Sequence, residues 1–79
     1  MFVVFDSDHV WGLGSTETEA FNDAEQYVTD AYGDFDIRRS SGQLIVAEAG
    51  NKIVALVNAK GGTNIKLYKD QSGKAHLIN

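Results

Sequence analysis

Apolar residues recur at helical spacing between residues 15 and 33, the longest stretch of the chain with a period of 3.6. Thr16 and Glu19 have the spacing of a capping box, which marks a helix start. Gly33 suits the left-handed residue that ends a helix. The apolar positions are Ala20, Phe21, Ala24, Tyr27, Val28, Ala31 and Tyr32. The pattern predicts one amphipathic helix over residues 16–32.

Two apolar runs before this helix predict a β-hairpin. Residues 2–5 are apolar on both faces, which is typical of a central strand. Asp6-Ser7-Asp8 is a sequence of turn residues, and residues 9–13 form the second predicted strand. The hairpin then leads directly into the helix.

The second half of the chain predicts shorter elements. Phe35 follows the helix and is expected to pack back onto the core, and residues 37–41 are expected to form an irregular edge. Residues 43–47 predict a third strand. Alternating residues at 65–68 and a return at 75–78 predict a final hairpin.

Residues 51–60 fit two structures. Three apolar residues keep helical spacing, Asn51 is a possible cap, and Gly61-Gly62 is a natural stop, which favours a short second helix. The same apolar run also fits a buried strand that would pair with residues 43–48, since period alone does not separate short runs. The three residues are Ile53, Leu56 and Val57.

These elements predict a single α+β domain. A chain of 79 residues is one small domain with a modest core. We expect an antiparallel sheet of four or five strands, with helix 16–32 across one face and a possible second short helix over 51–60. The absence of cysteine excludes a disulfide framework and a thiolate metal site.

The charges are divided unevenly along the sequence. Residues 1–37 hold nine acidic and no basic residues, whereas residues 38–79 hold seven basic and two acidic ones. The halves therefore carry −9 and +5, which gives the net charge of −4. This asymmetry indicates a polarised surface, unless the two halves neutralise each other within the fold.

The predicted helix carries an acidic stripe opposite its apolar face. No basic residue interrupts it, so the carboxylates are candidates for contact with a partner. We predict that the stripe and the acidic residue after the helix bind a partner protein: Glu19, Asp23, Gln26, Asp30 and Asp34.

Catalytic motifs are weak in this chain. VVFDSD resembles the first motif of haloacid dehalogenase phosphatases, which implies a metal-dependent hydrolase using Asp6 and Asp8. The chain is too short for the doubly wound domain of that family, so Asp6 and Asp8 are interpreted as turn residues. Gly12 and Gly14 lack the third glycine of a dinucleotide fingerprint and indicate tight backbone packing. We therefore expect no enzyme activity, no cofactor and no metal.

Other partner classes are also disfavoured. Arg38, Arg39, Lys66 and Lys69 could contact phosphates, but a sequence pI of about 4.8 disfavours direct nucleic-acid binding. The apolar start of the chain is too short for a signal peptide or a membrane span. The expected location is therefore the cytoplasm, without membrane association.

Several stretches resemble small proteins of bacteria and their phages. The stretch from Trp11 to Thr16, the acidic helix start and Lys60-Gly61-Gly62 resemble small orphan proteins of this kind. Gly14 to Ala24 also resembles the strand-to-helix passage of HicB-type antitoxins. In size and acidity the chain is similar to phage anti-CRISPR proteins.

The resemblances imply an interaction protein. The leading hypothesis is a phage-encoded inhibitor that blocks a host protein with a basic, nucleic-acid-handling surface, in the host cytoplasm. Its carboxylates would stand where phosphates normally bind. The alternatives are an antitoxin-like module that neutralises a small basic toxin, and the hydrolase using Asp6 and Asp8.

Overall fold

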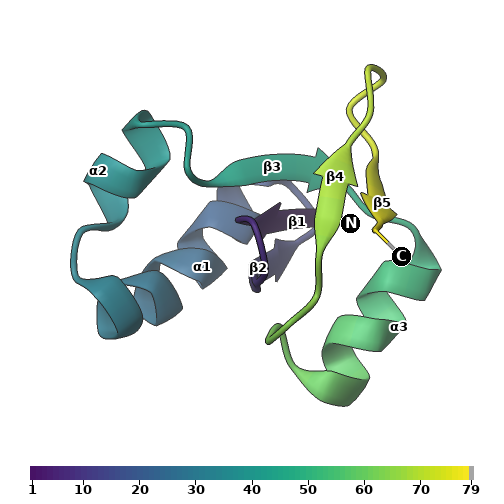
Figure 1. The fold of residues 1–79 in the computed structure, drawn as a ribbon, viewed down its shortest axis with the longest axis horizontal. Coiled ribbons are helices and arrows are strands. Elements are labelled where there is room, and N and C mark those ends of the chain that lie inside the picture. Colours follow the sequence, from purple (N-terminus) through teal and green to yellow (C-terminus); the bar gives the residue numbers. More distant parts are fainter. Residues whose placement is uncertain (79) are drawn as a thin grey trace.

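The computed structural model describes residues 1–78 and folds as one compact α+β domain (Figure 1). A three-stranded antiparallel sheet has the order β2-β1-β3, and β4 and β5 form a separate antiparallel hairpin. The elements in chain order are β1 (Phe2–Phe5), β2 (Val10–Gly14), α1 (Glu17–Tyr32), α2 (Phe35–Ser40), β3 (Ile45–Glu48), α3 (Asn51–Lys60), β4 (Leu67–Lys69) and β5 (Ala75–Leu77).

β1 is the central strand, as its two apolar faces predicted. Phe2 pairs with Gly14 of β2 on one side and with Glu48 of β3 on the other. Val4 faces α1, whereas Val3 and Phe5 face the opposite layer. Because successive strand residues point to opposite faces, these few residues link both halves of the core.

The ends of α1 confirm the predicted signals. Thr16 Oγ1 accepts a hydrogen bond from the Glu19 N–H, and the Glu19 carboxylate accepts from the backbone and hydroxyl of Ser15. Gly33 takes a φ of 91° and donates to the Thr29 carbonyl. The buried face consists of Ala20, Phe21, Ala24 and Val28.

α1 lies against the backbone of β2, as the glycine pattern indicated. A Cβ added at Gly12 would stand 2.4 Å from the Ala20 carbonyl oxygen and 2.6 Å from the Ala24 nitrogen. A Cβ at Gly14 would be equally close to the Ala20 nitrogen. Glycine on the strand and alanine on the helix therefore permit a contact that no larger side chains would allow.

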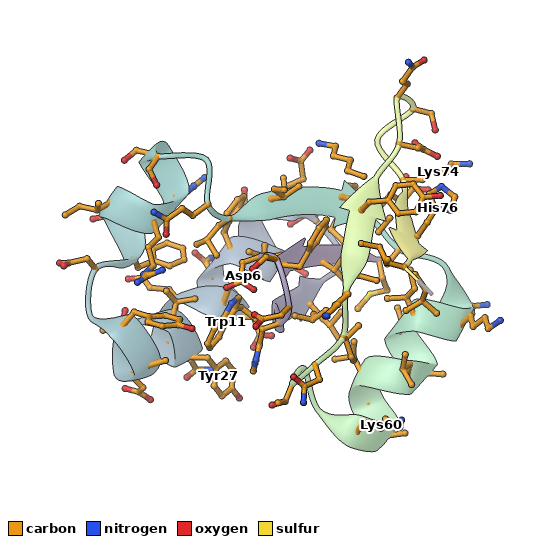
Figure 2. All side chains as sticks on the ribbon, viewed as in Figure 1. Asp6, Trp11, Tyr27, Lys60, Lys74 and His76 are labelled. Atoms are coloured by element: carbon orange, nitrogen blue, oxygen red, sulfur yellow. The ribbon has the colours of Figure 1, made fainter. Side chains whose placement is uncertain are left out.

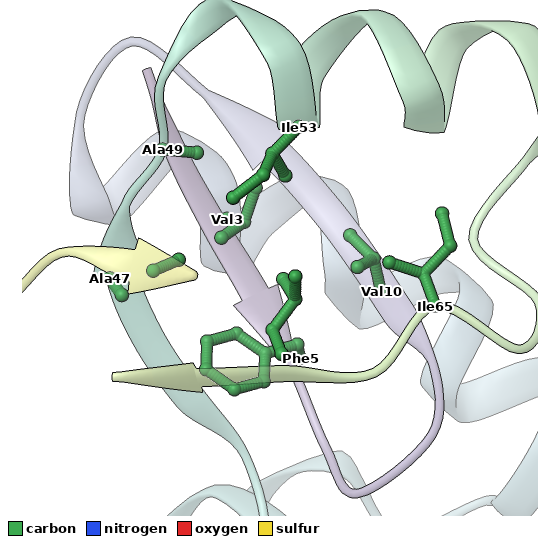
Figure 3. Packing of buried hydrophobic residues seen from close by; sticks show 9 residues of the cluster. Val3, Phe5, Val10, Ala47, Ala49, Ile53 and Ile65 are labelled. Carbon is green, nitrogen blue, oxygen red and sulfur yellow. The ribbon is translucent and has the colours of Figure 1, made fainter. Parts of the chain in front are cut away.

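The opposite face of the sheet is covered by side chains. Ile53 of α3 and Ile65 pack against Val3 and Phe5, and Leu67 of β4 completes the layer (Figure 3). α1 lies behind the sheet in Figure 1, and the β4–β5 hairpin crosses in front of it. The domain thus has two buried clusters with β1 between them.

Several local predictions need correction. Residues 37–41 are not an irregular edge, because Phe35–Ser40 form α2, a six-residue helix anchored by the buried Phe35. The third strand begins two residues later than predicted, at Ile45, since Leu44 turns into the core beside α1.

Of the two structures that the sequence allowed for residues 51–60, the helix is confirmed. These residues form α3, and Gly61 ends it with a φ of 75°. Its N-cap is Gly50, so the predicted cap at Asn51 is wrong and Asn51 is the first helical residue. The five strands are divided between two sheets because β4 and β5 pair only with each other along their length.

Candidate functional site

A groove runs along the edge of β2 that faces away from β1, where α1 and the end of α3 meet it. Its volume is about 520 Å³. Figure 2 shows Trp11 and Tyr27 on its β2 and α1 sides. The lining residues are His9, Val10, Trp11, Gly12, Leu13, Asp23, Tyr27, Asp30, Ala31, Val57, Gly61 and Gly62. The groove is mainly apolar, and its two carboxylates come from α1.

Backbone groups at this edge of β2 already have partners at both ends. The Leu13 N–H donates to Asp23 Oδ2 at 3.0 Å, and the Val10 N–H donates to the Gly62 carbonyl at 2.9 Å. These bonds blunt an edge that would otherwise pair with another strand. They also fix the walls of the groove, because each bond joins β2 to the element beside it.

The five predicted partner-binding residues do not form one surface. Asp23 and Asp30 lie together in the groove. Glu19 is at the start of α1, and its carboxylate accepts two hydrogen bonds from Ser15. These bonds lower the pKa of the Glu19 carboxyl, the one from the Ser15 hydroxyl more than the one from the Ser15 backbone. Gln26 is exposed on α1, and Asp34 lies beyond the helix end beside a separate hollow with Glu25.

Ion pairing does not neutralise this acidic region. Within residues 1–78, the one contact between acidic and basic groups at salt-bridge distance joins His76 to Asp70, on the β4–β5 hairpin. Arg38 and Arg39 instead stack over the rings of Tyr32 and Phe21, at 3.8 and 4.0 Å from the ring centroids. Within residues 1–78, no carboxylate of α1 therefore has a basic group at salt-bridge distance.

Asp6 and Asp8 form a turn, as predicted. Asp6 Oδ1 accepts from the Asp8 N–H at 3.2 Å, and Asp6 Oδ2 accepts from the Trp11 indole nitrogen at 2.8 Å. His9 stacks on the Trp11 ring at 3.9 Å between centroids. No cluster of three or more residues with metal-ligating side chains occurs among residues 1–78. Asp6 thus serves the hairpin and the position of Trp11.

A second polar cluster holds the β4–β5 turn. Asp70 Oδ1 accepts from the N–H of Ser72, the hydroxyl of Ser72 and the N–H of Lys74. Asp70 Oδ2 lies 2.6 Å from His76 Nε2. The His76 contact, followed by the bonds from Lys74 and Ser72, holds the pKa of Asp70 well below its ordinary value. The cluster stabilises the turn and lies on a different element from the groove.

The sequence did not identify the groove as a site. Tyr27 follows Asp23 by four residues and precedes Asp30 by three, so a helical projection places all three on neighbouring positions. The contributions of Trp11 and Val57 depend on tertiary contacts between segments far apart in sequence. The periodicity of one helix contains no information about such contacts.

Comparisons with protein-family models, with curated proteins and with solved structures gave no match to this chain. None of the helices within residues 1–78 combines the length and the apolar character that crossing a membrane requires.

Proposed function

We propose that this chain is an interaction protein whose acidic α1 region binds a basic surface on another protein. The concrete version is a phage-encoded inhibitor, anti-CRISPR-like in size and acidity, that blocks a nucleic-acid-handling host protein. The supporting observation is the absence of any ion pair to the α1 carboxylates within residues 1–78. Carboxylates without internal cations remain available to steer and hold a basic partner.

The mechanism of such an inhibitor is steric and electrostatic. Carboxylates on a helix face project oxygen acceptors towards solvent, as phosphates do along a nucleic-acid backbone. A basic surface that normally holds nucleic acid would then be occupied by protein. Because the charges are exposed, their attraction falls with added salt, mainly through a slower association rate.

The structure decides which substitutions test this proposal cleanly. Asp23 and Glu19 accept bonds that support the fold, so reversing their charge would disturb more than the surface. Gln26, Asp30 and Asp34 are exposed, and their side chains form no hydrogen bond to residues 1–78. The test variant is therefore Gln26→Lys with Asp30→Lys and Asp34→Lys.

A control with the same change in charge is available elsewhere. Gln71→Lys with Asp8→Lys and Glu48→Lys replaces one glutamine and two acidic residues at exposed positions outside α1. Both variants should melt cooperatively near the wild-type temperature, as surface substitutions usually do. Because both variants change the net charge equally, a difference in binding between them shows that the position of the charges matters.

The experiment is capture from a bacterial lysate at low and moderate salt, followed by mass spectrometry and an affinity measurement with the purified captured protein. We expect a basic protein whose binding weakens with salt. Its binding should fall at least about tenfold in the variant at Gln26, Asp30 and Asp34 and stay within about twofold in the control. Equal binding by both variants, or affinity indifferent to salt, would remove support for the proposal. Identification of a small basic toxin as the captured protein would favour the antitoxin alternative.

A further inference from the structure

Three aromatic rings lie along α1, and the protein places its own arginines over two of them. Arg39 lies over Phe21, and Arg38 lies over Tyr32. The third ring, Tyr27, has no cation over it from any of residues 1–78, although 52% of its surface is exposed. Phe21 is buried and Tyr32 lies edge-on to Trp11, so the three rings differ in their surroundings. Tyr27 is the ring of α1 that is exposed and has no arginine of residues 1–78 over it.

Carboxylates flank this open ring. Asp23 precedes Tyr27 by one helical turn and Asp30 follows it by almost one, so acceptors stand on both sides along the groove. Asp23 uses Oδ2 for the Leu13 N–H, and a carboxylate has acceptor positions beyond that one bond. Asp30 is exposed and forms no hydrogen bond through its side chain to the described residues.

Most of the remaining lining is apolar, and His9 is its one further ionisable side chain. Leu13 of β2 and Val57 of α3 line it, and Ala31 follows Tyr27 by one turn on α1. The stretch of α1 from Asp23 to Ala31 is roughly 12 Å long at the rise of an α-helix. An apolar channel of this kind accommodates the methylene stem of a long basic side chain, while the carboxylates meet its charged end.

We propose that the β2-edge groove receives an arginine side chain of the partner protein, with its guanidinium group on the ring of Tyr27. The proposal rests on the proposed function, since it names where the basic partner docks. A guanidinium is planar, stacks on aromatic rings and can bond a carboxylate through two N–H groups. A lysine ammonium is a compact point charge and has no planar face to stack. The two carboxylates repel phosphate, so a nucleic acid is not the occupant.

The probe is a blocked tripeptide, acetyl-Gly-Arg-Gly-amide, titrated into the ¹⁵N-labelled protein while amide shifts are recorded. Matched peptides carry lysine, or citrulline, which keeps the planar shape without the charge. We expect the arginine peptide to bind with a Kd of about 1 mM and to shift the amides of Leu13, Tyr27 and Gly62 most. The lysine peptide should bind several-fold more weakly, and the citrulline peptide should cause no saturable shift.

Two tyrosine variants provide the matched test. Tyr27→Leu removes the aromatic face in the groove, whereas Tyr68→Leu removes a ring of similar exposure, 50%, from β4. Tyr27→Leu should weaken the arginine peptide about two- to fivefold, and Tyr68→Leu should leave it unchanged. Asp30→Asn should weaken it as well, while Glu25→Gln, on α1 but outside the groove, should not.

The outcomes separate this inference from the proposed function. Equal binding of the citrulline and arginine peptides, shifts elsewhere on the surface, or an unchanged affinity in Tyr27→Leu would overturn the arginine site. Salt-sensitive capture of a basic protein that is unaffected by Tyr27→Leu would overturn the site and leave the function standing. Saturable peptide binding in the groove, with no basic protein captured, would leave the site standing and refute the function.

Discussion

On one face of the central sheet, α1 touches the backbone of β2, and on the other face side chains fill the space between the layers. At Gly12 and Gly14 no strand side chain separates β2 from Ala20 and Ala24. The same face also holds the buried cluster that includes Trp11, Phe21 and Val28. Across the sheet, Ile53 and its neighbours form ordinary apolar packing. Backbone contact fixes the distance between elements, whereas side-chain packing leaves room for small adjustment.

This difference has a consequence for the groove. Since α1 lies directly on β2, the position of Tyr27 relative to the edge of β2 that faces away from β1 is fixed by the fold, and the hydrogen bond from Leu13 to Asp23 ties the same two elements. A binding site on rigid elements needs little ordering when a ligand arrives. The backbone contact therefore supports the geometry on which the arginine proposal depends.

The largest expected effect comes from filling the backbone contact. Gly12→Ala places a Cβ against the Ala20 carbonyl and the Ala24 nitrogen, so α1 has to move away from the sheet. We expect a loss of about 3 kcal/mol or more in the free energy of unfolding, measured by urea denaturation. The control is Gly50→Ala, where a Cβ meets no atom within 4 Å and the loss should stay below about 1 kcal/mol. Equal losses in the two variants would show that the contact is not tight.

A smaller effect is expected from the bond that ties α1 to the edge of β2. Asp23→Ala leaves the half-buried Leu13 N–H without its acceptor, which should reduce the free energy of unfolding by about 1–2 kcal/mol. Asp30→Ala removes an exposed carboxylate from the same groove and should change it by less than about 0.5 kcal/mol. Similar losses in the two variants would show that the hydrogen bond from Leu13 to Asp23 adds nothing to the stability of the fold.

On the opposite face, a conservative change should be tolerated. Ile53→Val removes one buried methylene from the side-chain layer and should lower the free energy of unfolding by about 1 kcal/mol. The urea transition should stay cooperative, and the dependence of the free energy of unfolding on urea concentration should not change. A cost as large as that of Gly12→Ala would contradict the distinction between the two faces.

Local sequence signals correctly predicted both ends of α1 and the C-terminal end of α3. Thr16 and Gly33 mark the ends of α1, and Gly61 ends α3, because caps act on residues within one turn. α2 escaped prediction because its residues are mostly polar and only Phe35 is buried, so no apolar period is present. Neighbouring positions on α1 placed Asp23 and Asp30 on one side of the helix, but the sequence contains no local sign of the bond from Leu13 to Asp23.

The smallest expected effect concerns the β4–β5 hairpin, which lies on the side-chain-packed face. Its two strands pair through their backbones, and a polar cluster around Asp70 holds its turn. The pKa of Asp70 is lowered first by His76, then by the N–H of Lys74 and by Ser72. A lowered folded-state pKa means that the stabilisation is complete above the ordinary aspartate range. It is lost as the pH falls below that range and through the lower folded value.

The hairpin should therefore stay ordered at neutral pH and loosen only in acid, while α1 remains packed on β2. An NMR titration of the Asp70 carboxyl carbon measures this directly. His76→Phe keeps a ring on Tyr68, removes the imidazole nitrogen, and should raise the pKa of Asp70 part of the way to its ordinary value. Ser72→Ala should raise it less, because the Ser72 hydroxyl contributes less than His76. A larger rise with Ser72→Ala than with His76→Phe would show that the hairpin is held by its serine turn and not by the histidine contact.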